Sequence, residues 1–219
     1  MQIAIDGPAG AGKSTVAKKV AETLQYLYID TGAMFRSLTY EAIRLKIDLS
    51  NGEELRKLLE SLEITFLQTD EGQRVFLNHH DVTEHIRSPQ VSKYVSIVAT
   101  HKEVRDEMLI RQQQLAKEGQ VVMDGRDIGT HVLTDADLKI FLTASANERA
   151  KRRYAELKEK GIETNLAQLK KEIEERDKRD SEREIAPLKK AKDAIEIDTT
   201  HLSIDDVVEK ILTLVKERS

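Results

Sequence analysis

The feature that most constrains the fold of this chain is a glycine-rich segment near its N-terminus, Gly7-Pro8-Ala9-Gly10-Ala11-Gly12-Lys13-Ser14. It matches the pattern of a glycine, four residues and then Gly-Lys-Ser, in which backbone N–H groups converge on phosphate oxygens. An apolar run at residues 2–5 precedes it, and Val16, Val20 and Leu24 follow at helical spacing. We therefore expect a buried strand, a phosphate-binding loop and a helix, which is typical of an α/β fold.

The residue types of this loop indicate that it binds a nucleoside triphosphate together with a Mg²⁺ ion. Lys13 is expected to contact the β- and γ-phosphates, and the Ser14 hydroxyl to ligate the magnesium. The helix that follows points its positive end at the same phosphates. We assign ATP binding to the loop and to two later arginines: Gly7, Pro8, Ala9, Gly10, Ala11, Gly12, Lys13, Ser14, Thr15, Arg149 and Arg152.

Further short apolar runs predict four more buried strands, at 27–29, 121–124, 138–142 and 194–197. They alternate with segments of helical periodicity, and this alternation predicts a P-loop α/β fold with a central parallel sheet of five strands flanked by helices. A chain of 219 residues fits one domain, or one domain carrying a small insert.

The pattern changes at residue 63. Residues 63–69 and 74–78 alternate apolar and polar side chains on either side of a turn at Asp70-Glu71-Gly72, which is typical of an antiparallel hairpin. Ser88 and Pro89 then provide an N-cap and a first helical residue. We predict a core at about 1–60 and 98–219, an acceptor-binding insert at about 61–97, and a helical lid at about 148–183.

Composition excludes several classes of protein. There is no cysteine, so disulfides, thiolate zinc sites and a cysteine nucleophile are excluded. The 35 basic and 39 acidic residues are interspersed, which argues against a nucleic-acid-binding protein. Neither a leader segment nor a run of about 20 apolar residues is visible. We expect a cytoplasmic monomer with neither nucleic acid nor membrane as a partner.

The number of arginines at candidate site positions indicates that the acceptor of the transferred group is a phosphate, which needs no general base. An acceptor phosphate has its second pKa near 6, so its attacking oxygen is already charged, whereas an alcohol would need a carboxylate to take its proton. Guanidinium groups bind phosphate oxygens well, and the chain carries suitable ones at Arg36, Arg105, Arg126, Arg149, Arg152, Arg153, Arg176 and Arg183. Arg176, Asp180 and Arg183 share one helical face, for which an ordinary ion-paired surface is the alternative.

Several strings then make the chain recognisable: Ile5-Asp6-Gly7-Pro8, Asp30-Thr31-Gly32-Ala33-Met34-Phe35-Arg36, Asp124-Gly125-Arg126-Asp127-Ile128-Gly129-Thr130, Glu175-Arg176-Asp177 and Ala186-Pro187-Leu188. Together they resemble the bacterial cytidylate kinases, nucleoside monophosphate kinases that transfer the γ-phosphoryl group of ATP to CMP or dCMP. The resemblance covers nearly the whole chain. The hairpin region is similar to the enlarged CMP-binding insert of the bacterial enzymes, which the shorter eukaryotic UMP/CMP type lacks.

The resemblance implies a substrate role for nine residues. Those at the CMP phosphate are Thr31, Arg36, Arg126 and Arg183, those at the cytosine edge are Ser96, Arg105 and Asp127, and those at the pentose are Arg176 and Asp180. The residues expected to stabilise charge on the transferring group are Lys13, Arg126, Arg153 and Arg183.

Two of these positions, and one neighbour, can be examined by their chemistry. The Asp127 carboxylate can accept from the cytosine amino group, which uracil lacks. Ser96 lies opposite an apolar helical stripe, so spacing alone predicts an exposed serine. Phe35 stands where the family commonly has tyrosine, so a hydroxyl contact is missing there.

Two alternatives stay open. The same chemistry could serve another acceptor, such as UMP, AMP or a molecule that is not a nucleotide. Alternatively, the chain could be a non-catalytic switch that binds nucleotides and signals to a partner.

Overall fold

A computed structural model describes residues 1–69 and 72–218 of the chain, which divides into two units. Unit 1 comprises Met1–Tyr28 and Glu118–Ser219, and unit 2 comprises Ile29–Lys117. Within the described residues, no helix combines the length and apolar character that crossing a membrane requires. Two residues of the turn predicted at 70–72, Asp70 and Glu71, lie outside the described part of the chain.

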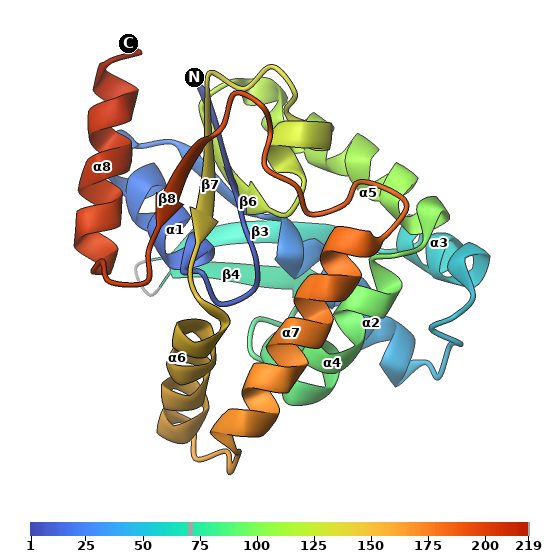
Figure 1. The fold of residues 1–219 in the computed structure, drawn as a ribbon. Coiled ribbons are helices and arrows are strands. Elements are labelled where there is room, and N and C mark those ends of the chain that lie inside the picture. Colours follow the sequence, from blue (N-terminus) through green and yellow to red (C-terminus); the bar gives the residue numbers. More distant parts are fainter. Residues whose placement is uncertain (70–71, 219) are drawn as a thin grey trace. The chain divides into compact units, whose positions relative to one another are not determined.

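The predicted five-stranded sheet is confirmed, with the strand order β2-β6-β1-β7-β8 (Figure 1). Its strands are β1 (Gln2–Asp6), β2 (Leu27–Asp30), β6 (Val121–Gly125), β7 (Leu138–Thr143) and β8 (Ile195–Asp198). β1 pairs in parallel with β6 and with β7, and β7 pairs in parallel with β8. Since parallel strands end at one edge, the register Asp6↔Gly125 brings the loops after β1 and β6 together.

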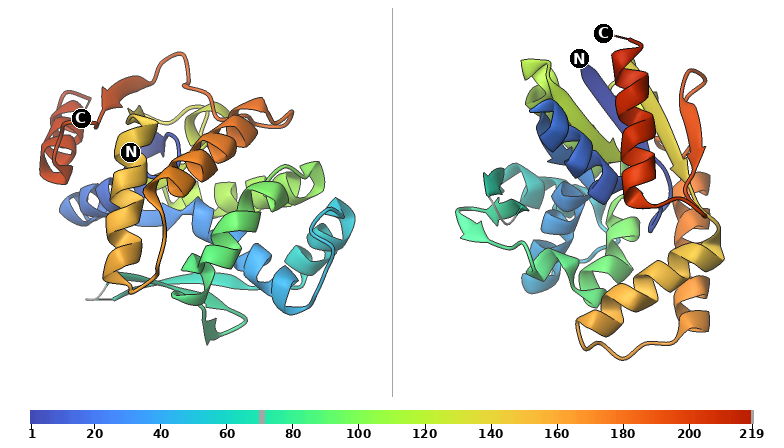
Figure 2. Two further views of the ribbon diagram at one scale, coloured as in Figure 1. Left: turned by 60° about the horizontal axis from the view of Figure 1, so that its bottom comes forward. Right: turned by 90° about the vertical axis from the view of Figure 1, so that its left-hand side faces the viewer.

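Unit 1 also contains the helices α1 (Lys13–Leu24), α6 (Ala146–Glu159), α7 (Leu166–Glu182) and α8 (Ile204–Lys216), and the short helical turn η3 (Ile128–Val132). α1 and α8 pack against each other beside the sheet (Figure 2), and their apolar side chains share one core with those of the strands. Val16 and Ile211 are fully buried there against Ile5 and Ile140. α6 and α7 form a helical hairpin, which contains most of the residues predicted as the lid.

Side-chain caps stand at the start of three of these helices. Ser203 and Asp206 form the reciprocal capping box of α8. The Ser145 hydroxyl accepts from the backbone N–H of Glu148 at the start of α6. Asn165, which the sequence did not single out, caps α7. Each of the helices α6, α7 and α8 therefore begins at a residue whose side chain accepts from a backbone N–H of the first turn.

Unit 2 has its own core and its own small sheet. Its elements are α2 (Thr31–Arg44), α3 (Gly52–Glu60), β3 (Ile64–Thr69), β4 (Gly72–Leu77), β5 (His80–Asp81), η1 (His85–Arg87), α4 (Pro89–Val98) and α5 (Lys102–Leu115). Leu38, Leu55 and Met108 lie in its apolar core.

The antiparallel hairpin predicted in unit 2 is confirmed, and a third strand extends it. β3 pairs with β4, and β4 pairs with the short β5. Asn78 and His79 both have positive φ angles, 46° and 67°, and turn the chain tightly between β4 and β5. The third strand was not predicted, because the turn before it contains no glycine to mark it.

Candidate active site

The glycine-rich loop connects the end of β1 with the first turn of α1. Gly7 has a φ of 148°, and a Cβ there would lie 2.0 Å from the carbonyl oxygen of Leu142, so only glycine fits. Gly12 is the N-cap of α1 and has no side chain with which to cap it. The N–H groups of the first turn are therefore available to an anion.

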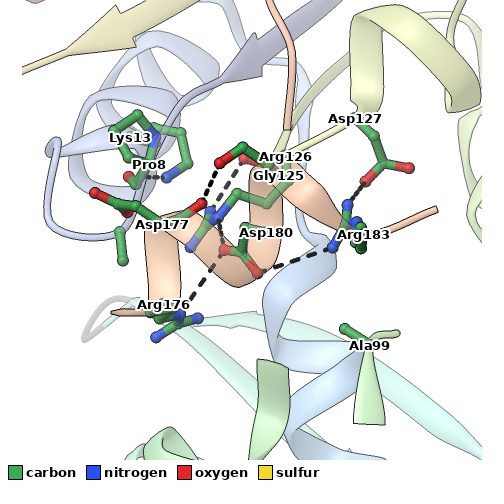
Figure 3. A network of polar contacts seen from close by, with 12 residues as sticks. Pro8, Lys13, Ala99, Gly125, Arg126, Asp127, Arg176, Asp177, Asp180 and Arg183 are labelled. Carbon is green, nitrogen blue, oxygen red and sulfur yellow. Dashed lines mark hydrogen bonds and ion pairs between the residues drawn. The ribbon is translucent and has the colours of Figure 1, made fainter. Parts of the chain in front are cut away.

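Lys13 follows directly and is only 5% exposed. Its Nζ donates to the carbonyl oxygen of Pro8 across 2.8 Å (Figure 3). Burial and the nearby guanidinium of Arg126 lower the pKa of Lys13 well below its ordinary value, although Asp124 acts in the opposite direction. A cation held at this electrostatic cost marks a site that favours an incoming anion.

Asp124, at the end of β6, faces the same loop. The Ser14 hydroxyl donates to one of its carboxylate oxygens across 2.9 Å, and the Tyr28 hydroxyl donates to the other across 2.8 Å. A hydroxyl and a carboxylate side by side are the oxygen donors that Mg²⁺ prefers. The residues present therefore fit a magnesium ion at this point of the loop.

Asp6 is a second buried carboxylate, at the end of β1. It accepts from the backbone N–H groups of Ile128 and Gly129 across 2.8 Å and 2.7 Å. Burial raises the pKa of Asp6 to about 7, while these two N–H groups act to lower it. Asp6 thereby ties the strand before the loop to the turn that follows Asp127.

Three of the arginines that the sequence singled out, Arg126, Arg176 and Arg183, lie around one carboxylate of α7 (Figure 3). Asp180, which is 4% exposed, accepts from Arg126 Nε across 3.1 Å and lies 3.9 Å from Arg176 and 4.0 Å from Arg183. Arg183 also donates to Asp127 across 3.3 Å. Burial raises the pKa of Asp180, but the three arginines hold it below its usual value. This helical face is thus a buried network, so the alternative of an ordinary surface is wrong.

The three arginines of α6 have separate partners. Arg149 is buried and donates to carbonyl oxygens of Ala9 and Ala144. Arg152 donates to both the hydroxyl and the carbonyl oxygen of Thr199. Arg153 pairs with Glu156 of its own helix across 2.8 Å.

In unit 2, the start of α2 holds Thr31 and Arg36. Asp30 caps the helix by accepting from the N–H of Ala33, and it pairs with Arg36 across 2.7 Å. Although burial raises the pKa of Asp30, Arg36 and Arg87 bring it below its ordinary value. Arg36 is thereby held in place, and Thr31, the first residue of α2, is buried.

Ser96 and Arg105 lie on α4 and α5 and are both buried. The expectation of an exposed Ser96 is wrong: it is 4% exposed, since α4 packs against α2 and η1 and is covered beyond its apolar stripe. The guanidinium of Arg105 lies over the ring of Phe35, 5.4 Å from its centroid, and donates to the carbonyl oxygen of Ala99. The phenylalanine thus offers an aromatic face to a predicted cytosine-binding arginine.

Four residues to which the sequence patterns assigned no role contact the site in unit 1: Asp6, Asp124, Asp177 and Thr199. Asp6 and Asp124 could have been found, because each ends a predicted parallel strand, and strand ends meet at one edge of the sheet. Thr199 donates to the carbonyl oxygen of Ala11 in the loop, a contact that no local pattern signals.

Comparisons with known proteins agree with this geometry. Residues 3–217 match a family model described as cytidylate kinase. A cytidylate kinase of Bacillus cereus is 60% identical over 215 residues, which cover 98% of this chain and 96% of that protein. A cytidylate kinase of Bacillus cytotoxicus is 60% identical over 217 residues, covering 99% and 96%. The crystal structure of a shikimate kinase from Bacteroides thetaiotaomicron is similar in fold, with a TM-score of 0.50, 13% identity, and coverage of 99% of this chain and 98% of that one.

Proposed function

The chain belongs to the cytidylate kinase family and phosphorylates CMP or dCMP, and we propose that ATP with Mg²⁺ is its donor and that the residues described above carry the transfer. The observation that most supports this assignment is the buried Lys13, whose pKa is lowered in a loop built to receive an anion. The reaction moves the γ-phosphoryl group to a phosphate oxygen of the acceptor and releases ADP and CDP or dCDP.

On the donor side, the loop from Gly7 to Thr15 binds the phosphates of ATP through its N–H groups and through Lys13. Binding removes the electrostatic cost of the buried lysine, because the phosphates neutralise its charge. This gain is specific to an anionic ligand and supports a nucleoside triphosphate in the loop.

Ser14 and Asp124 would hold the magnesium ion. When bound, Mg²⁺ would neutralise the negative charge that develops during the transfer. Tyr28 keeps the Asp124 carboxylate oriented through its own hydrogen bond.

On the acceptor side, unit 1 contributes Arg126 and Arg183 to the phosphate of CMP, and Arg176 and Asp180 to its pentose. Asp127 accepts from the cytosine amino group. The buried network around Asp180 supports these roles, since arginines that are already paired lose little side-chain entropy when a substrate binds.

Thr31 and Arg36 also bind the CMP phosphate, and Ser96 and Arg105 bind the cytosine edge. The ion pair with Asp30 fixes the direction of Arg36, and the ring of Phe35 supports Arg105. The 61–97 segment stays our prediction for the CMP-binding insert.

The transfer needs positive charge and needs no general base. The attacking phosphate oxygen is already ionised, so no side chain has to remove a proton. Lys13, Arg126, Arg153 and Arg183 stabilise the charge spread over the transferring group. Arg149 and Arg152 belong to the ATP side of the lid at 148–183. A monomeric state and a cytoplasmic location stay predictions of the sequence.

The test is ADP release with ATP–Mg²⁺ against CMP, dCMP, UMP, AMP and GMP in parallel, with Lys13→Ala as the control. We expect turnover on CMP and dCMP that the variant loses. A preference for another monophosphate would overturn the cytosine-reading residues. Tight ATP binding without turnover on any acceptor would favour a nucleotide-binding switch instead.

A further inference from the structure

Arg149 uses its guanidinium group on three separate parts of unit 1. Nε donates to the carbonyl oxygen of Ala144, the residue after β7, across 2.9 Å, and Nη1 donates to the carbonyl oxygen of Ala9 in the phosphate loop across 3.0 Å. Nη2 pairs with the carboxylate of Asp177 on α7 across 2.6 Å. The residue is only 5% exposed. All three guanidinium nitrogens of Arg149 thus contact an oxygen atom of the protein.

The phosphate loop also packs directly on α6 at this point. Gly10 has a φ of 78°, and a Cβ there would lie 3.1 Å from the Cβ of Arg149. The close approach leaves the loop backbone and the base of the arginine in van der Waals contact. A shift in the position of Arg149 would therefore move the backbone of the loop at Gly10.

α7 carries the other half of this arrangement. Asp177 and Asp180 are three residues apart on this helix, and they pair with Arg149 and Arg126 respectively. One helix therefore connects the phosphate loop with an arginine assigned to the CMP phosphate.

We propose that Arg149 is a positioning residue for the phosphate loop, and that Asp177 keeps its guanidinium directed at the carbonyl oxygen of Ala9. ATP affinity then depends on a carboxylate of α7 that does not contact ATP. The inference rests on the proposed function, in which the loop binds ATP.

Charge alone predicts the opposite behaviour. Asp177 carries a negative charge close to the phosphate loop, because it pairs with Arg149. If only charge mattered, removing the charge of Asp177 would reduce the repulsion of an anionic nucleotide and strengthen its binding. If Asp177 acts by orienting Arg149, removing its charge loosens the loop and weakens binding. The two effects differ in sign, and a single substitution separates them.

The decisive variant is Asp177→Asn, and Glu174→Gln is its matched control. Glu174 lies three residues earlier on the exposed face of α7, so the control removes the same charge from the same helix without touching Arg149. ATP binding to each protein is measured by calorimetry, with and without Mg²⁺. We expect Asp177→Asn to weaken ATP binding about tenfold and Glu174→Gln to leave it unchanged.

A second variant, Arg149→Lys, keeps the positive charge but cannot reach three acceptors at once. We expect a higher KM for ATP, a smaller change in the KM for CMP, and faster hydrogen exchange at the amides of residues 9–13, with protection of Ile3–Ile5 unchanged. Exchange that rises equally in the strand would mean a general loss of stability and would overturn the positioning role.

The outcomes distinguish this inference from the proposed function. A wild-type protein that binds no ATP would contradict the proposed function itself. A wild-type protein that binds ATP and turns over CMP, beside an Asp177→Asn variant that binds ATP equally or more tightly, would overturn only the role of Arg149 and Asp177.

Discussion

The Ser14 hydroxyl donates to a carboxylate oxygen of Asp124 across 2.9 Å. This contact joins the first turn of α1 to the end of β6, two elements that are 110 residues apart in the chain. A hydroxyl and a carboxylate that are held together in this way could supply two oxygen ligands to a magnesium ion. The pair therefore defines where a magnesium ion would lie relative to the phosphate loop.

Substitution of Asp124 tests this assignment. We expect Asp124→Asn to raise the Mg²⁺ concentration for half-maximal turnover by about tenfold or more, because an amide oxygen is a weaker ligand than a carboxylate. Mn²⁺ affinity in the presence of ATP, measured by electron paramagnetic resonance, should fall in parallel. Ser14→Thr retains a hydroxyl and serves as the control. An unchanged metal dependence in Asp124→Asn would remove Asp124 from the site.

Replacement of Lys13 should separate stability from activity. The pKa of Lys13 is lowered mainly by burial, so the charged lysine costs the ligand-free protein stability. We expect Lys13→Met to raise the Tm of the ligand-free protein and to lower kcat by roughly 100-fold or more. Thermal unfolding with and without ATP checks this: ATP should stabilise the wild type far more than the variant. A lower Tm in the ligand-free variant would contradict the argument.

Asp6 should make stability depend on pH in a defined window. Its pKa is about 7 in the folded protein and 3.8 for the ordinary carboxyl group, so between these values the folded chain binds a proton that the unfolded chain does not. This contribution to the free energy of unfolding is present below about pH 4 and is lost as the pH rises to about 7, by up to about 1.4 kcal/mol per pH unit.

The matching measurement is urea unfolding of wild type and Asp6→Asn at several pH values from 4 to 8. The difference in unfolding free energy between the two proteins should change across that window, since the variant cannot titrate. Asp205→Asn, on the exposed side of α8, controls for the loss of a carboxylate. A difference that stays constant with pH would show that Asp6 is ionised throughout.

Asp127 should determine the choice of base. We expect Asp127→Ala to lower kcat/KM for CMP strongly and to reduce the preference for CMP over UMP by about tenfold or more, because the acceptor for the cytosine amino group is lost. Steady-state kinetics with both monophosphates measure the ratio. If kcat/KM falls equally for CMP and UMP, Asp127 acts by holding Arg183, with which it pairs, and does not read the base.

Phe35 should influence CMP binding through Arg105. The guanidinium lies 5.4 Å from the ring centroid, an arrangement that contributes about 0.5–1 kcal/mol, or a factor of about three in affinity. We expect Phe35→Leu to raise the KM for CMP by about that factor. Phe35→Tyr keeps the aromatic face and should behave as the wild type. Equal effects of both substitutions would rule out the ring as the cause.

The sheet and the phosphate loop were predictable because their signals are local. Short apolar runs, the Gly-Lys-Ser pattern and the Ser88–Pro89 helix start each lie within a few residues and need no distant partner. The hairpin of unit 2 was predictable for the same reason, from alternating side chains in β3 and β4. The turn at Asn78 and His79 was missed, since a positive φ at histidine has no local signature.

Only the tertiary structure determines which residues that lie far apart in the sequence contact each other. The packing of α6 and α7 against the strand ends decides two such cases. It determines whether Arg149 binds a ligand or the carbonyl oxygen of Ala9, and whether Asp180 is exposed or surrounded by arginines. Spacing along the chain establishes which side chains share a helical face, because helix geometry is a property of neighbouring residues. It does not establish what that face meets, because burial and the resulting pKa shifts arise from contacts between segments that lie far apart in the sequence.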